Sequence, residues 1–181
     1  GRPRSPRTTP PAWPDEDEDP VGFLATWGSH PRWLVERWVE RWGAAEARRL
    51  VEANNRRPEL YLRPIGVSAA EAIERLAAAG IGAEPVPFAP DSVHVLPPAS
   101  VADALAAVPA VVQDPAAGLV VRYADVPPGG LVVDLAAAPG GKALATAVEA
   151  LYTVAADASF ARMGRVRENA ERLAAARLGL L

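Results

Sequence analysis

Residues 131–142 read LVVDLAAAPGGK, and this stretch decides the predicted fold. Its first part, LVVDLAA, is apolar enough for a strand buried on both faces, as strands of parallel sheets are. The turn Pro139-Gly140-Gly141 has no β-carbon at its two glycines to keep a ligand from the backbone. A helix beginning near Lys142 would point its free N–H groups back at this turn. The order strand, turn, helix predicts an α/β fold that binds a carboxylate or a phosphate of a cofactor.

A second strand supports this site. The run LYTVAAD, residues 151–157, ends in Asp157, and an acidic residue at the end of the second strand holds ribose hydroxyls in such folds. A P-loop would need Gly at position 136 and Ser or Thr at position 143, where this chain has alanines, and no G-x-G-x-x-G is present. A plain surface turn remains the alternative, because Lys142, the only lysine of the chain, would equally suit an exposed helix.

Composition limits the classes of protein to consider. The chain has 181 residues, of which 50% are apolar and 23% charged, enough for one ordinary domain or two small ones. No apolar run is long enough to cross a membrane and the N-terminus lacks the apolar core of a signal peptide, so we expect a cytoplasmic protein. Without cysteine, and with only His30 and His94 as imidazole ligands, we expect no disulfide and no metal site.

Charge is distributed unevenly along the chain. The formal net charge is −3, but Asp15 to Asp19 read DEDED, and arginines outnumber glutamates both between residues 32 and 63 and between residues 162 and 177. Such basic patches suit a polyanion, although arginine-rich solvated helix faces would look the same. The arginines that we predict to contact RNA are Arg37, Arg41, Arg56 and Arg57.

The sequence divides into four predicted parts. Residues 1–20 are rich in proline and acid and are predicted to be a flexible linker. Residues 21–57 are predicted to be a helical pair, whose first helix follows Ser29-His30-Pro31 and carries a stripe of tryptophans at helical spacing. That stripe could stack bases, but core packing is the more common role of such a pattern. The pair is predicted to end before Pro58.

The remaining two parts are predicted to contain sheets. Residues 58–112 show strands at 60–65, 83–89 and 92–96 and helices at 68–79 and 100–107, the pattern of a small split-βαβ (ferredoxin-like) domain. Such sheets often bind RNA, but the aromatic strand motif of RNA-recognition sheets is missing here. Residues 113–181 are predicted to be the N-terminal part of a Rossmann-like domain, in which Asp114-Pro115 begins a helix.

Several blocks of the chain resemble one family in order. They are SHPRWLVERWVERWG (29–43), VEANNRRP (51–58), VVQDPAAGLVV (111–121), DLAAAPGGKALA (134–145), VAADAS (154–159) and RVRENAERL (165–173). Over residues 21–181 the sequence is similar to the bacterial ribosomal RNA cytosine-5 methyltransferases of the RsmB/Sun type. The resemblance departs from the family pattern at Ala136, where the family commonly has cysteine, and at Leu151-Tyr152, where a glycine usually precedes the second strand.

The resemblance implies that residues 113–181 are the N-terminal part of a Rossmann-like methyltransferase domain, and it implies a cofactor and a reaction. The cofactor is S-adenosylmethionine, the substrate is cytosine in ribosomal RNA, and the methyl group goes to C5 of the base. The implied cofactor site has a methionine end held by Ala136, Ala137, Ala138, Pro139, Gly140, Gly141 and Lys142, and a ribose held by Asp157.

The same resemblance shows what the sequence lacks. The family's chemistry uses a thiolate that adds to C6 of cytosine, and its two cysteines lie beyond the last block matched here. Two clear parallel strands are also too few for a stable sheet. We therefore expect a fragment that is inactive alone; in similar enzymes an RNA-binding helical domain precedes this region. The alternative is a non-catalytic RNA-binding or ribosome-assembly module that retains the methyltransferase fold.

Overall fold

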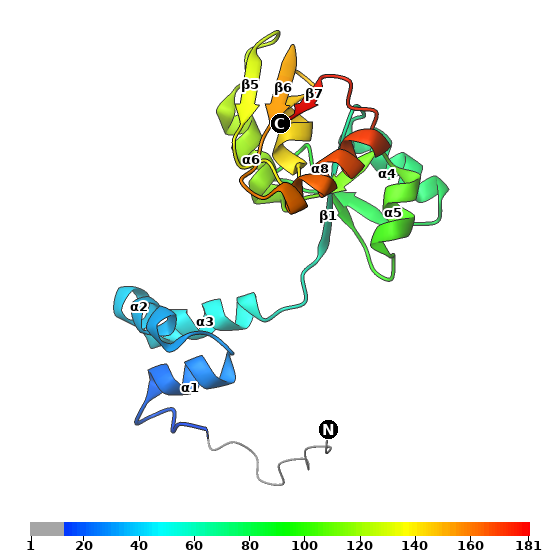
Figure 1. Ribbon diagram of the computed structural model, residues 1–181. Coiled ribbons are helices and arrows are strands. Elements are labelled where there is room, and N and C mark those ends of the chain that lie inside the picture. Colours follow the sequence, from blue (N-terminus) through cyan, green and yellow to red (C-terminus); the bar gives the residue numbers. More distant parts are fainter. Residues whose placement is uncertain (1–12) are drawn as a thin grey trace, which may run out of the picture. The chain divides into compact units, whose positions relative to one another are not determined.

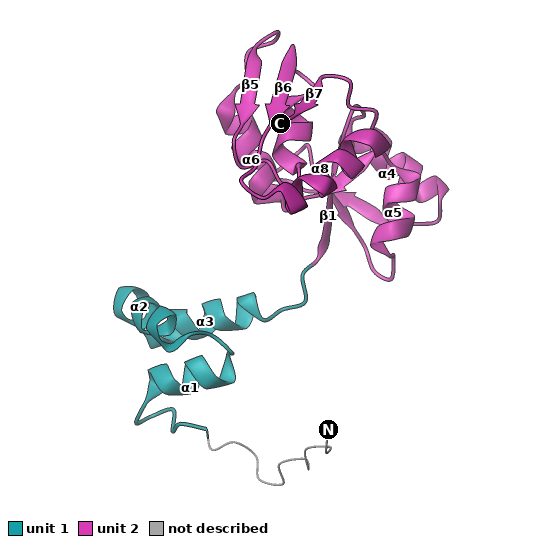
Figure 2. Cartoon of the chain, viewed as in Figure 1, with its two compact units in different colours: residues 1–58 teal, residues 59–181 magenta. Residues whose placement is uncertain are grey.

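The computed structural model describes residues 13–181. It divides the chain into two compact units, residues 1–58 and 59–181, each described by itself below (Figure 2). Residues 1–12 of the predicted flexible linker lie outside the described residues.

The first unit consists of three helices, which are α1 (Pro20–Trp27), α2 (Arg32–Trp42) and α3 (Ala44–Asn54) (Figure 1). The sequence predicts α2 and α3 but not α1, so the predicted pair has a third, preceding helix. The tryptophan stripe divides in the structure: Trp38 packs against the core of Leu24, Val35 and Ala47, whereas Trp33 is 63% exposed and Trp42 48% exposed. Core packing therefore explains only part of the stripe.

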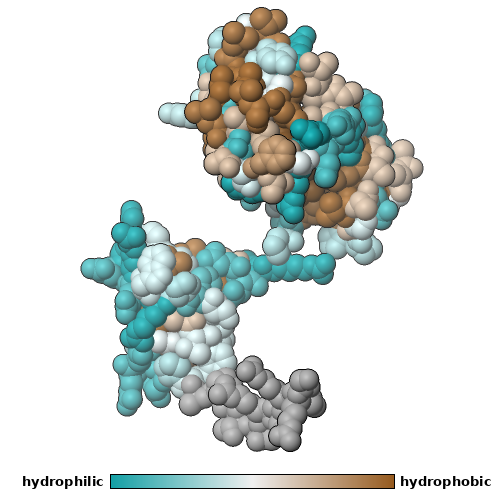
Figure 3. Space-filling view, in the orientation of Figure 1, coloured by the Kyte–Doolittle hydropathy of each residue, from teal (hydrophilic) through white to brown (hydrophobic). Residues whose placement is uncertain are grey.

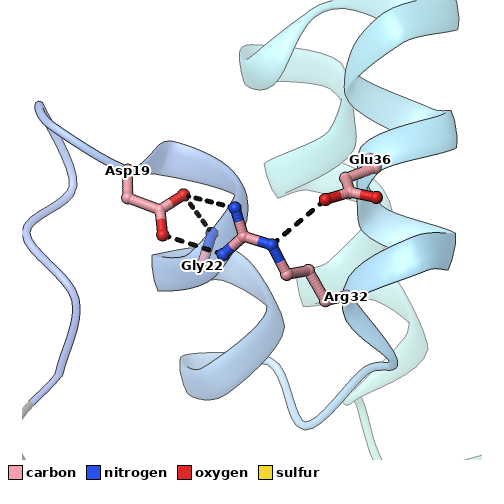
Figure 4. A network of polar contacts seen from close by, with 4 residues as sticks. All are labelled: Asp19, Gly22, Arg32 and Glu36. Carbon is pink, nitrogen blue, oxygen red and sulfur yellow. Dashed lines mark hydrogen bonds and ion pairs between the residues drawn. The ribbon is translucent and has the colours of Figure 1, made fainter.

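Helix α1 begins at an ion pair that the acidic block provides (Figure 4). Asp19 accepts a hydrogen bond from the Gly22 N–H at 2.9 Å and two from the Arg32 guanidinium, at 2.8 and 3.1 Å. Arg32 also donates to Glu36 at 3.1 Å. Arg32, followed by the Gly22 N–H, holds the pKa of the Asp19 carboxyl below its usual value. This end of the predicted linker thus caps a helix.

The second unit contains an antiparallel sheet with the strand order β2-β3-β1-β4. Its strands are β1 (Leu60–Pro64), β2 (Ala83–Pro85), β3 (Val93–Val95) and β4 (Ala110–Val112), and its helices are α4 (Ala69–Ala78) and α5 (Val101–Ala107). Leu62 pairs with Val93 on one side and with Val112 on the other. Leu62, Leu76, Val93 and Val108 are buried together in the core of this part. The predicted split-βαβ fold is confirmed, with β4 as a strand that the sequence does not reveal.

A parallel sheet of order β5-β6-β7 completes the second unit. Its strands are β5 (Leu131–Asp134), β6 (Tyr152–Ala155) and β7 (Leu178–Leu180), and its helices are α6 (Pro115–Ala124), α7 (Gly141–Thr146) and α8 (Phe160–Arg172). The predicted α/β class is confirmed. The sequence predicts β5 and β6 but not β7, and it extends both strands too far at their C-terminal ends.

Strand β5 differs from the prediction in its burial. Leu131 is 76% exposed and Val133 60% exposed, although the sequence predicts a strand buried on both faces. Figure 3 shows apolar residues gathered on this side of the second unit. The reason is that Leu131 and Val133 lie on the same face of the sheet, and no other element of residues 13–181 covers these side chains.

Candidate functional site

The candidate site lies where β5 and β6 end side by side. The two strands are parallel, with Asp134 in register with Ala155, so their C-terminal ends meet at one edge of the sheet. The turn after β5 is joined to the segment after β6 by a hydrogen bond from the Ala137 N–H to the Ala156 carbonyl at 3.0 Å. The structure thus brings the predicted turn and Asp157 together at the edge where open α/β sheets bind ligands.

Asp157 is the most enclosed charged side chain of this edge. Its side chain is 3% exposed and accepts hydrogen bonds from the Ser159 N–H at 2.8 Å and the Ala138 N–H at 3.2 Å. Arg162 donates a third hydrogen bond at 2.9 Å. The Ser159 N–H lowers the pKa of the Asp157 carboxyl most; burial opposes this, while the Ala138 N–H and Arg162 lower the pKa further. The ionised carboxylate therefore fastens the turn to the segment after β6.

The two glycines of the turn face the protein. Gly140 has φ +104°, and a β-carbon there would lie 3.1 Å from Cγ1 of Val166. A β-carbon at Gly141 would lie 2.8 Å from Nε2 of Gln113. Packing inside the protein therefore requires glycine at both positions, and the approach of a ligand to this backbone stays a prediction. The glycines leave room for the chain's own side chains.

The turn nevertheless has donors for an anion. Four N–H groups of the turn already have acceptors: Ala136 donates to the Asp134 carboxylate, Ala137 to the Ala156 carbonyl, Ala138 to the Asp157 carboxylate and Gly140 to the Ala137 carbonyl. Within residues 13–181, the N–H groups of Gly141 and Lys142 meet no acceptor, since they open helix α7. Lys142 is exposed beside them. A carboxylate of a cofactor would fit these two donors and the lysine.

The predicted RNA-contacting arginines share one property. Arg37 and Arg41 lie on α2, Arg56 and Arg57 follow α3, and all four are exposed. In the described part of the chain, none of them forms an ion pair with a carboxylate. Three other arginines of the same unit do form ion pairs: Arg32, Arg48 and Arg49. The four candidates therefore keep their charge available for phosphates.

Two buried polar residues near the site were not predicted. Gln113 is 8% exposed, and its side chain occupies the space that a β-carbon at Gly141 would need; the side chain of Arg63 is 12% exposed. Arg63 and Arg122 both approach Asp91, at 3.8 and 3.7 Å, beside a polar cavity of about 360 Å³. A polar residue between a strand and a capped helix, as in the run VVQDP, is the one sequence signal for Gln113.

Residues 13–181 contain neither a membrane-spanning helix nor a cluster of metal-binding side chains. No helix in this range is both long enough and apolar enough to cross a membrane. No group of three or more potential metal-binding side chains comes together in the same range.

Comparisons with known proteins agree with this geometry. A family model described as "Methyltr_RsmF/B-like, ferredoxin-like domain" matches residues 30–102. The chain is 35% identical over 154 residues to the ribosomal RNA small subunit methyltransferase B of Yersinia pseudotuberculosis, covering 80% of this chain and 35% of that protein. It is 38% identical over 84 residues to a probable ribosomal RNA small subunit methyltransferase B of Bacillus subtilis, covering 45% of this chain and 19% of that protein.

A solved structure shares the fold. NSun6 from Pyrococcus horikoshii, whose structure was determined with SFG, superposes with a TM-score of 0.71 at 16% identity, covering 83% of this chain and 65% of that one. The chain spans about a third or less of the length of its two curated relatives. Over that span, the chain is similar to ribosomal RNA methyltransferases of the RsmB/Sun-like family.

Proposed function

We propose that this chain forms the cofactor-binding part of an enzyme that transfers a methyl group from S-adenosylmethionine to C5 of a cytidine in ribosomal RNA. The observation that carries the proposal is the common edge of β5 and β6, where free N–H donors and a charged carboxylate lie on neighbouring strand ends. The names of the curated relatives support ribosomal RNA as the substrate.

Each part of the site has a role in this proposal. S-adenosylmethionine supplies an activated methyl group on its sulfonium. The N–H groups of Gly141 and Lys142 hold its carboxylate, the Lys142 side chain adds a positive charge, and Asp157 accepts hydrogen bonds from the ribose hydroxyls. The structure of NSun6 with SFG supports a small-molecule site in this fold.

The first test substitutes Asp157. Asp157→Asn removes the charge and replaces the acceptor of one of the two backbone N–H donors by an amide NH2 group, so we expect S-adenosylmethionine to bind about 10- to 100-fold more weakly. Isothermal titration calorimetry measures this loss. Asp103→Asn, in helix α5, is the control and should bind like the wild type. Unchanged affinity in Asp157→Asn, with the fold intact by circular dichroism, would exclude Asp157 from the site.

A second candidate function is a non-catalytic RNA-binding module. The four exposed arginines without carboxylate partners favour it, because RNA affinity of this kind needs neither a cofactor nor a cysteine. The two functions differ in one measurable respect. The module would bind ribosomal RNA equally well with and without a functional cofactor site, and Asp157→Asn would have no effect on any of its activities.

The RNA surface is tested by salt dependence. The double variant Arg56→Ala/Arg57→Ala should weaken binding to a single-stranded ribosomal RNA fragment and lower the slope of log K against log salt by about 0.7 for each phosphate that is no longer neutralised. Fluorescence anisotropy at several salt concentrations gives both values. Arg49→Ala is the matched control, because Arg49 is exposed but paired with Glu46 at 2.8 Å. Equal slopes in all three proteins would show that these arginines belong to a solvated surface and do not contact RNA phosphates.

A further inference from the structure

Arg162 covers the carboxylate that the proposed function assigns to the ribose. It lies in the first turn of α8, and its Nη2 donates to Oδ1 of Asp157 at 2.9 Å. The two side chains differ sharply in exposure: that of Arg162 is 64% exposed and that of Asp157 only 3%. An exposed, flexible side chain therefore closes access to an enclosed carboxylate.

The three donors to Asp157 differ in whether they can leave. The Ser159 and Ala138 N–H groups belong to the backbone, and releasing either would move the segment after β6 or the turn after β5. Arg162 can leave by rotating its own side chain. A carboxylate accepts about four hydrogen bonds, so with three in place little capacity remains for the two hydroxyls of a ribose.

We propose that Arg162 occupies the ribose position of the cofactor site in the free protein, and that a ribose binds by displacing its guanidinium from Asp157. This inference rests on the proposed function and specifies how that site is controlled. The two backbone hydrogen bonds keep the carboxylate in place once Arg162 has left, so the ribose meets an acceptor that is already oriented.

The energetics favour such an exchange. An ion pair with one partner largely in solvent is weak and screened by salt, so displacing Arg162 costs little. Two ribose hydroxyls replace one guanidinium donor and restore the hydrogen bonds of the carboxylate. Arg162 then acts as a specificity residue, because only a ligand that supplies its own donors to Asp157 recovers what the displacement costs.

The test compares ligands with and without a ribose. Arg162→Ala should bind S-adenosylmethionine and adenosine about two- to fivefold more tightly than the wild type, the size of a weak ion pair, and should bind methionine equally. Raising the salt concentration should tighten adenosine binding to the wild type and not to the variant. Arg165→Ala, an exposed arginine on α8, is the control and should match the wild type.

Four outcomes decide the inference. Weaker adenosine binding in Arg162→Ala would show that Arg162 supports the site, and equal binding would show that it does not compete; either result overturns the proposal. Carbodiimide labelling of Asp157, read by peptide mass spectrometry, tests the covering without any ligand: we expect faster labelling in Arg162→Ala than in Arg165→Ala, and equal rates would overturn it. If labelling is faster but neither S-adenosylmethionine nor adenosine binds any of these proteins, the cofactor assignment fails and the covering of Asp157 stands.

Discussion

Gly140→Ala is expected to lower the free energy of unfolding of this chain by about 1 to 3 kcal/mol, the cost of a non-glycine residue held at an unfavourable φ. Gly140 has φ +104°, where a side chain is strained, and the added β-carbon would lie 3.1 Å from Cγ1 of Val166. Val166 is fully buried in the core beneath the turn, so it has little room to move. Thermal unfolding followed by circular dichroism measures the effect.

Gly164→Ala is the matched control for this prediction. Gly164 lies inside helix α8, and a β-carbon there would meet nothing within 4 Å. Alanine should stabilise the helix by about 0.5 to 1 kcal/mol, since glycine loses more conformational freedom on folding. If Gly140→Ala proves as harmless as Gly164→Ala, then the turn does not hold this backbone conformation, and the placement of the Gly141 and Lys142 N–H groups loses its basis.

The larger elements of this fold could be predicted because their patterns are strong. Helix α4 has a serine cap whose hydroxyl accepts from the Glu71 N–H, and α2 has an apolar face, so both follow from short-range rules. The parallel strand β5 followed from its apolar run and the turn after it. These features depend on residues close in the sequence, which one sequence contains in full.

The elements that were missed depend on distant partners. Strands β4 and β7 have three residues each, Ala110–Val112 and Leu178–Leu180. Strands β2 and β3 are equally short, but they lie within the longer runs 83–89 and 92–96 that were predicted as strands. The segments β4 and β7 are strands because β1 and β6 supply hydrogen-bonding edges for them. Helix α1 was missed because the acidic block before it was interpreted as a linker, whereas Asp19 caps the helix and pairs with Arg32.

The candidate site also has features that could be predicted from the sequence and features that could not. The turn and Asp157 were predicted to be neighbours because strand order alone brings their ends together. The role of Gln113 beside Gly141 and of Arg162 over Asp157 could not be predicted, because both depend on side-chain directions after the sheet has formed. The glycines illustrate the difference: their position was predicted, but the packing against Val166 and Gln113 that requires them was not.

The amino-acid composition alone limits the catalysis that we expect from this chain. The chain contains no cysteine. C5 of cytosine is a poor nucleophile until a group adds to C6, and in this family's chemistry that group is a thiolate. This chain should therefore bind the cofactor but form no covalent intermediate with RNA.

A mechanism-based substrate makes this an all-or-nothing experiment. The chain is incubated with S-adenosylmethionine and a ribosomal RNA fragment containing 5-fluorocytidine, in which fluorine at C5 blocks release of the enzyme from the base, and a covalently shifted band is sought on a denaturing gel. We expect no shifted band from this chain and a clear one from the Yersinia pseudotuberculosis relative as the positive control. Calorimetry on the same preparation should still show S-adenosylmethionine binding, which separates the loss of chemistry from a loss of folding. A shifted band from this chain would require a nucleophile other than cysteine, and would overturn both the expectation that the chain is an inactive fragment and the thiolate mechanism.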